Sequence, residues 1–81
     1  MAESVKERVR KIVSRNVGGE FRDKPIPDDV TLIGSLLDSM AVNSLIVALE
    51  EEFGFAFEDE DLSAEAFENV PALAALVERK L

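Results

Sequence analysis

The chain has 81 residues, 17 of them acidic and 9 basic, and its formal net charge at pH 7 is −8. It contains no cysteine and no histidine, which excludes disulfides, thiolate metal sites and the commonest general base of catalysis. The length predicts one small domain over residues 1–81. The start lacks the apolar core of a signal peptide, and no apolar run is long enough to span a bilayer. We therefore expect a cytoplasmic protein without membrane insertion.

The charges are unevenly distributed along the chain. Residues 1–24 hold seven basic and four acidic side chains, a net charge of +3, whereas residues 25–81 carry a net charge of −11. A surface this acidic repels phosphates, so we expect no nucleic-acid partner. A protein with a basic docking patch is the natural complement, although acids of this kind also serve solubility alone.

The first predicted element is a helix over residues 4–17. Apolar residues recur there at helical spacing, at Val5, Val9, Ile12 and Val13. Ser4 followed three residues later by Glu7 is the pattern of a capping box. The glycines at positions 18 and 19 indicate where the helix ends.

A long loop is predicted from Gly18 to about Leu37. Pro25 and Pro27, followed by two aspartates, favour turns and prevent regular pairing. A loop of this length in a small domain is often functional. We expect apolar side chains to fix it over the core, namely Phe21, Ile26, Leu32, Ile33, Leu36 and Leu37.

The next helix is predicted to begin at Asp38 or Ser39 and to end at Phe53, before Gly54. Its buried face is one apolar stripe, made of Val42, Leu45, Ile46, Leu49 and Phe53. Asp38 is suited to capping the helix, and Ser39 would then lie, exposed, at the positive end of the helix dipole. That end favours a phosphate on the serine oxygen, although an Asp-Ser pair before a helix is more often only a capping signal.

The C-terminal third predicts a short helix, roughly Ser63 to Glu68, and a last helix opened by Pro71. The buried face of the last helix would be Leu73, Leu76, Val77 and Leu81. Together the elements predict an all-α four-helix bundle with a short third helix and a long loop between the first two helices.

The acidic run from Glu58 to Glu68 invites comparison with a calcium-binding loop. The sixth position of such a loop would be Ala64 rather than glycine, and the twelfth would be Val70 rather than glutamate. We therefore predict no metal site, while weak binding of divalent cations to the clustered acids stays open.

Catalysis by Ser39 is close to excluded. A nucleophilic serine needs a base, usually histidine, and a third group that orients the base. The chain has no histidine, and no Ser-x-x-Lys arrangement surrounds Ser39. We therefore predict that the chain is not an enzyme and that any chemistry at Ser39 is carried out on it by another protein.

Other residues of the 39–53 helix carry two interpretations each. Glu50, Glu51 and Glu52 are most simply a solvated helix end, but acids there oppose the helix dipole, and a basic partner would favour them. Met40 and Val47 lie seven residues apart and off the buried stripe. Core packing and partner contact are equally open for both.

These features together resemble the acyl carrier protein and peptidyl carrier protein family over nearly the whole chain. The most specific part is the sequence LLDSM, followed by a helix that ends with ALEEEFG. The attachment motif of the family, usually Asp-Ser-Leu, stands here as Asp38-Ser39-Met40. The form GSLLDSM looks like D-alanyl carrier proteins and other free-standing aminoacyl carriers.

The resemblance implies a monomeric carrier whose Ser39 receives 4′-phosphopantetheine from a phosphopantetheinyl transferase, with Asp38 and Met40 beside the attachment point. The thiol of this arm would carry an acyl or aminoacyl group as a thioester. The implied partners are a loading ligase, adenylation enzyme or acyltransferase, and a downstream synthase or transferase. The 39–53 helix would be the recognition helix, with its partner-binding residues at Met40, Asn43, Val47, Glu50 and Glu51.

One departure from the family bears on the pathway. Fatty-acid carriers typically have acids soon after the serine, where this chain has Ala41 and Ser44 with Asn43 beside them. This favours polyketide, nonribosomal peptide or aminoacyl-transfer pathways. Two alternatives stay open: a fatty-acid carrier, and an unmodified acidic helical adaptor in which Ser39 only caps the helix.

Overall fold

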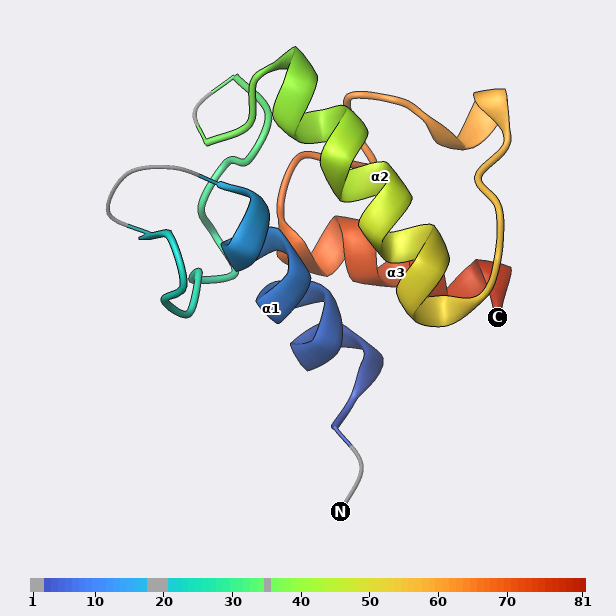
Figure 1. Cartoon of the computed structure of the whole chain (residues 1–81), viewed down its shortest axis with the longest axis horizontal. Coiled ribbons are helices and arrows are strands. Elements are labelled where there is room, and N and C mark those ends of the chain that lie inside the picture. Colours follow the sequence, from blue (N-terminus) through green and yellow to red (C-terminus); the bar gives the residue numbers. More distant parts are fainter. Residues whose placement is uncertain (1–2, 18–20, 35) are drawn as a thin grey trace.

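The computed structural model describes residues 3–17, 21–34 and 36–81, with Ser39 described by its backbone alone. Within these residues the regular structure is three α-helices, α1 (Val5–Asn16), α2 (Ser39–Phe53) and α3 (Val70–Lys80), and one 3-10 turn, η2 (Asp59–Asp61). Helix α1 packs against both other helices. The N-terminal end of α2 lies at the upper edge of Figure 1, away from both chain termini. The expected all-α architecture is confirmed.

The core lies where the three helices and the long loop meet. Fully or nearly fully buried side chains come from the three α-helices and the long loop, among them Val9, Ile12, Val13, Ile26, Leu32, Leu37, Leu45, Leu49, Leu73, Leu76 and Val77. Burying one such side chain contributes roughly 1.5–3 kcal/mol. Val42, Ile46 and Phe53 complete the predicted stripe of α2 as partly buried residues. The prediction for Leu81 is wrong, because α3 ends at Lys80 and Leu81 is left 61% exposed.

Local signals set the ends of α1 and α2. The Ser4 hydroxyl caps α1 by accepting the Glu7 amide at 3.2 Å, while the Glu7 carboxylate pairs with Arg10 rather than closing a capping box. Gly54 ends α2 in the left-handed conformation, with φ of 69°, and donates its amide to the Glu50 carbonyl. The predicted stop signals at positions 18 and 19 lie outside the described residues.

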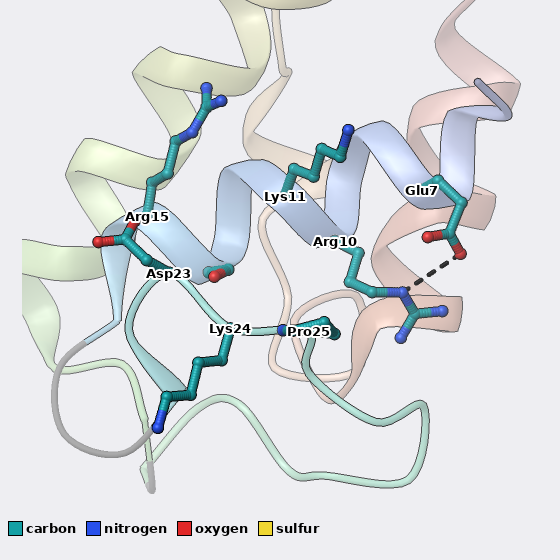
Figure 2. A pocket seen from close by; sticks show the side chains of 8 residues that line it. Glu7, Arg10, Lys11, Arg15, Asp23, Lys24 and Pro25 are labelled. Atoms are coloured by element: carbon teal, nitrogen blue, oxygen red, sulfur yellow. Dashed lines mark hydrogen bonds and ion pairs between the residues drawn. The ribbon is translucent and has the colours of Figure 1, made fainter. Parts of the chain in front are cut away.

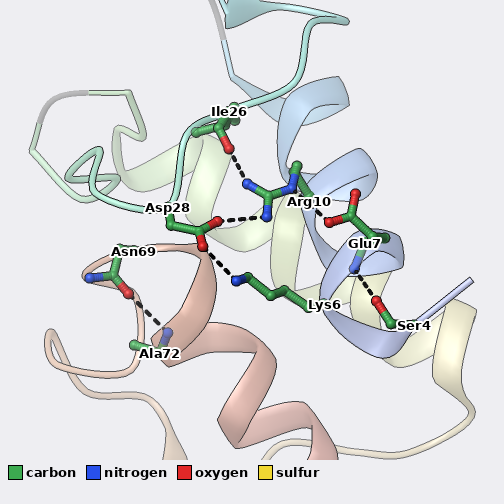
Figure 3. Close-up of polar contacts among 8 residues, drawn as sticks. All are labelled: Ser4, Lys6, Glu7, Arg10, Ile26, Asp28, Asn69 and Ala72. Carbon is green, nitrogen blue, oxygen red and sulfur yellow. Dashed lines mark hydrogen bonds and ion pairs between the residues drawn. The ribbon is translucent and has the colours of Figure 1, made fainter.

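The long loop is tied to α1 by polar contacts (Figure 3). The Arg10 guanidinium donates to the Ile26 carbonyl and, at 2.6 Å, to the Asp28 carboxylate, which also accepts from Lys6. These contacts hold the pKa of Asp28 below its ordinary value, Lys6 having the larger effect and Arg10 the next, and they raise the pKa of Arg10. These contacts therefore hold residues 26–28 of the loop against α1.

The end of the loop closes on itself just before α2. The Leu32 carbonyl accepts the amides of Leu36 and Leu37, and the Leu32 amide donates to the Glu68 carbonyl at 2.8 Å. Leu32 and Leu37 thereby turn into the core. The prediction that Ile33 is buried is wrong, because it lies on the outer side of this closed loop and is 38% exposed.

The short third element takes a form other than the expected helix over residues 63–68. Here the chain makes successive turns, in which the Ser63 hydroxyl accepts the Ala66 amide at 3.3 Å and the Glu68 amide donates to Glu65. Six residues allow too few helical hydrogen bonds to offset the cost of starting a helix. The 3-10 turn η2 forms a few residues earlier, where the Asp61 carboxylate accepts the Glu58 amide and pairs with Lys80.

Candidate functional site

Asp38 caps the N-terminal end of α2, as predicted. Its backbone is extended, with φ of −90° and ψ of −178°, and its carboxylate accepts the Ala41 amide at 2.8 Å. Its carbonyl accepts the Val42 amide at 2.9 Å. The Asp38 side chain is therefore directed to the first turn of the helix that it starts.

Residue 39 is the first residue of α2, and its side chain lies outside the described part of the chain. In any α-helix the amides of the first turn lack an acceptor within the helix. Asp38 provides one for Ala41, whereas helix geometry aims the amides of residues 39 and 40 past the end of the helix. The first turn itself contains no acidic residue, and the carboxylate of Asp38 at this helix end is committed to the Ala41 amide. This donor set fits a phosphate ester on residue 39.

The exposed face of α2 presents apolar side chains to solvent. Met40 is 80% exposed and Val47 is 51% exposed, while Leu45 and Leu49 on the opposite face are fully buried. Core packing is therefore excluded for Met40 and Val47. Asn43, Ser44 and Glu51 are also exposed. Met40, Asn43, Val47 and Glu51 form a surface that we call the α2 stripe, which spans roughly 16 Å along the helix.

The three consecutive glutamates of α2 have three different environments. The Glu50 carboxylate accepts the Phe57 amide at 2.8 Å, and the Glu52 carboxylate pairs with Arg8 at 2.8 Å. Glu51 is exposed, and the described residues include no ion-pair partner for it. The simpler prediction, that all three glutamates are only solvated, is wrong for Glu50 and Glu52, because their carboxylates contact other residues of the chain. Of the two acids expected to bind partners, Glu51 alone has an uncommitted carboxylate among the described contacts.

The sequence did not predict the role of Arg8. Its guanidinium stacks over the Phe53 ring at 4.4 Å and donates to both the side chain and the carbonyl of Glu52. Arg8 thereby fixes the C-terminal end of α2 against α1. The only sequence signal was the acidic C-terminal end of α2. Acids there oppose the helix dipole and favour a nearby cation, but the sequence pattern does not identify which residue supplies it.

Other kinds of site find little support in the described residues. No three acidic side chains are grouped there so as to hold a metal ion. No helix in the same ranges is long and apolar enough to cross a membrane.

Comparison with known proteins gives concordant matches. The family model described as the phosphopantetheine attachment site matches residues 7–77. The acyl carrier protein of Solidesulfovibrio magneticus is 32% identical over 78 residues, which cover 95% of each chain. That of Nitratidesulfovibrio vulgaris is 39% identical over 59 residues, 72% of this chain and 75% of its own.

A solved structure is similar in the same way. The solution NMR structure of a holo acyl carrier protein from Nitrosomonas europaea matches with a TM-score of 0.74 and 37% sequence identity. The match covers 96% of each chain, so the likeness includes all three helices and the loops between them.

Proposed function

The chain belongs to the phosphopantetheine-attachment family of acyl carrier proteins, and we propose that Ser39 is the residue that carries its covalent 4′-phosphopantetheine. Bound, this arm supplies a terminal thiol that holds an acyl group as a thioester. The chain is a carrier and not a catalyst, in keeping with its lack of a histidine base. The observation that supports Ser39 is its place as the first residue of α2, directly after the Asp38 cap.

The residues around position 39 have distinct parts in this proposal. Asp38 fixes the first turn, in which residue 39 lies, through the Ala41 amide. The helix amides of residues 39 and 40 favour the negative charge of the phosphodiester. Buried Leu45 and Leu49 hold α2 on the core, so the attachment point is carried by a rigid element.

The attachment is tested by incubating the chain with coenzyme A and a phosphopantetheinyl transferase and measuring its intact mass. We expect the parent chain to gain the mass of one arm and Ser39→Ala to gain none. Ser44→Ala is the matched control, since it removes an exposed serine hydroxyl from the same helix. Addition of an arm to Ser39→Ala would show that another residue is the acceptor.

We also propose that the α2 stripe is where partner enzymes dock. The expected partners are the transferase, a loading ligase, adenylation enzyme or acyltransferase, and a downstream synthase. An exposed apolar side chain such as Met40, close to the attachment point, is suited to bind an apolar pocket on an enzyme that acts on the phosphopantetheine arm. Glu51 adds one negative charge at the far end of the stripe, suited to a basic residue of the same enzyme.

The cargo that fits this stripe best is an aminoacyl group or a specialised acyl unit of polyketide or nonribosomal peptide synthesis, carried in the cytoplasm. The first three turns of α2 hold no acid, so a partner gains little there from a strongly basic surface. A fatty-acid carrier is the second candidate, favoured by the overall likeness to relatives named acyl carrier proteins. Intact mass of the protein purified from its own host distinguishes the two, because it reports the arm together with the cargo.

A further inference from the structure

A second charged surface lies on α1, on the side away from α2. In Figure 1 the segment 21–25 lies to the left of α1, whereas α2 and α3 pack at its right. A hollow of about 350 Å³ opens between α1 and this segment (Figure 2). Four cations and two acids line it, namely Arg10, Lys11, Arg15, Lys24, Glu7 and Asp23. We call this surface the basic hollow.

The basic hollow has a fixed backbone frame. Asp23 adopts the left-handed conformation, with φ of 59°, and donates its amide to the Ser14 carbonyl at 3.1 Å. The buried Ser14 hydroxyl donates to the Phe21 carbonyl at 3.3 Å. These bonds fold the turn onto α1 and bring Lys24 to the same hollow as Arg15, nine positions earlier in the chain.

The cations of the hollow differ in how far the chain itself neutralises them. Arg10 is held by Glu7 and Asp28, and Lys11 pairs with Glu3 at 2.5 Å. For Arg15 and Lys24, both exposed, the described residues record no ion pair. Arg15 and Lys24 are therefore the cations that the hollow offers to another molecule, beside one carboxylate, that of Asp23, for which the described contacts likewise include no ion pair.

We propose that the basic hollow binds a short acidic segment of a protein partner, separately from the docking of enzymes on α2. A nucleic acid or an anionic membrane is a poor fit, because its closely spaced charges would extend beyond the hollow to Asp28, Asp29 and the rest of a segment with net charge −11. A short peptide segment ends within the hollow and avoids that repulsion. A partner bound there would leave the α2 stripe open.

The test is a titration of the ¹⁵N-labelled holo chain with a blocked peptide of alternating Glu and Ala, followed by amide shifts. We expect shifts in the amides of residues 11–16 and 21–24, and unchanged amides in 39–53. Arg15→Glu and Lys24→Glu should each weaken binding about three- to tenfold, since each turns an exposed attraction into a repulsion. Arg79→Glu is the control, because it makes the same charge change at an exposed position of α3.

Several results would overturn the proposal. Equal weakening by Arg79→Glu would reduce the binding to net charge, and shifts confined to α2 would place it elsewhere. Tighter binding to phosphatidylglycerol vesicles or poly(U) RNA would assign the hollow to another class of partner, and dimerisation lost in Arg15→Glu would assign it to a second copy. The Ser39→Ala chain should bind the peptide unchanged, so failure here is distinguishable from failure of the attachment proposal.

Discussion

Carboxylates close together in this sequence differ in their structural roles. The contacts that each carboxylate makes, rather than the acidic composition of the segment, show which role it has. Asp38 and Glu50 each accept a backbone amide, of Ala41 and Phe57 respectively, both at 2.8 Å. A carboxylate that already accepts an amide is a weaker attractor of a partner's cation, because part of its charge is satisfied internally. Counting the acids of α2 therefore overstates the charge that it presents for docking.

Alanine at position 50 should affect stability, whereas alanine at position 51 should affect partner binding. We expect Glu50→Ala to lower the free energy of unfolding by about 1 kcal/mol, since it leaves the half-buried Phe57 amide without its acceptor. Glu51→Ala should change stability by less than about 0.5 kcal/mol. In arm transfer, Glu51→Ala should raise KM severalfold while Glu50→Ala leaves it near the parent value.

Urea unfolding followed by circular dichroism measures the stabilities, and transferase kinetics measure KM. The assignment of tasks is contradicted when Glu50→Ala is as stable as the parent chain, or when it raises KM more than Glu51→Ala does.

At the scale of elements, α1 and α2 are joined at one end by a compact cluster. The Arg8 guanidinium contacts the Phe53 ring and the Glu52 carboxylate together, so its position is defined by two groups at once. Both Arg8 and Glu52 are more than one third exposed, which allows water and salt to screen the ion pair. The ring contact is screened less because it also buries apolar surface.

A double-mutant cycle separates these two contributions. We expect the Arg8–Glu52 coupling free energy to stay below about 1 kcal/mol and to shrink at high salt. Arg8→Ala should cost more than this coupling, because it also removes the contact with Phe53, worth about 0.5–1 kcal/mol. Urea unfolding of Arg8→Ala, Glu52→Ala and the double variant, at low and high salt, gives these values. A coupling that equals the whole cost of Arg8→Ala would remove the ring contact from the account.

The sequence predicted what is decided within one turn of a helix. Asp38 and Gly54 mark the ends of α2 because a cap acts on amides or carbonyls three or four residues away. The same local pattern placed Met40 and Val47 off the buried stripe. Whether they were exposed required the packing of the other elements around α2, which spacing alone does not give.

The misplaced residues depend on distant contacts. Ile33 is exposed because a loop closes around Leu32, and the Leu32 amide is held by the carbonyl of Glu68, 36 positions later in the chain. Glu52 has its partner 44 positions away, and Glu50 has its partner seven positions away across a turn. Helical periodicity carries no information on either pair.

At the scale of the whole molecule, opposite charges are gathered on different parts of the fold. The first 24 residues carry +3 and the remainder −11, and Asp28 pairs with Lys6 and Arg10 where the two parts meet. Within the acidic part itself, Asp61 and Lys80 form another ion pair, which lowers the pKa of Asp61 and raises that of Lys80. Such links stabilise the fold in the pH range where both partners are charged.

The Asp28 link predicts a defined acid response. Its pKa is lowered in the folded chain, chiefly by Lys6 and then by Arg10, so its stabilisation is present above the ordinary aspartate pKa of roughly 4. This stabilisation is lost as the pH falls through the lowered pKa. We expect Asp28→Asn to be less stable than the parent chain at pH 7, with a difference that closes below about pH 4.

Urea unfolding at a series of pH values tests this response. Asp29→Asn is the matched control, since it removes an adjacent exposed carboxylate for which the described residues record no ion pair. A parent–variant difference that is the same at pH 7 and pH 3, or one that Asp29→Asn reproduces, would contradict the role of the link.

The hydrogen bond from the Leu32 amide to the Glu68 carbonyl joins two connecting segments, since Leu32 lies in the segment before α2 and Glu68 in the segment before α3. The segments that lead into α2 and α3 are therefore joined by this backbone hydrogen bond. Displacement of either segment would break this bond and allow the Leu32 amide to exchange its hydrogen for deuterium from the solvent. The hydrogen-exchange rate of the Leu32 amide therefore reports how often the segment before α2 opens.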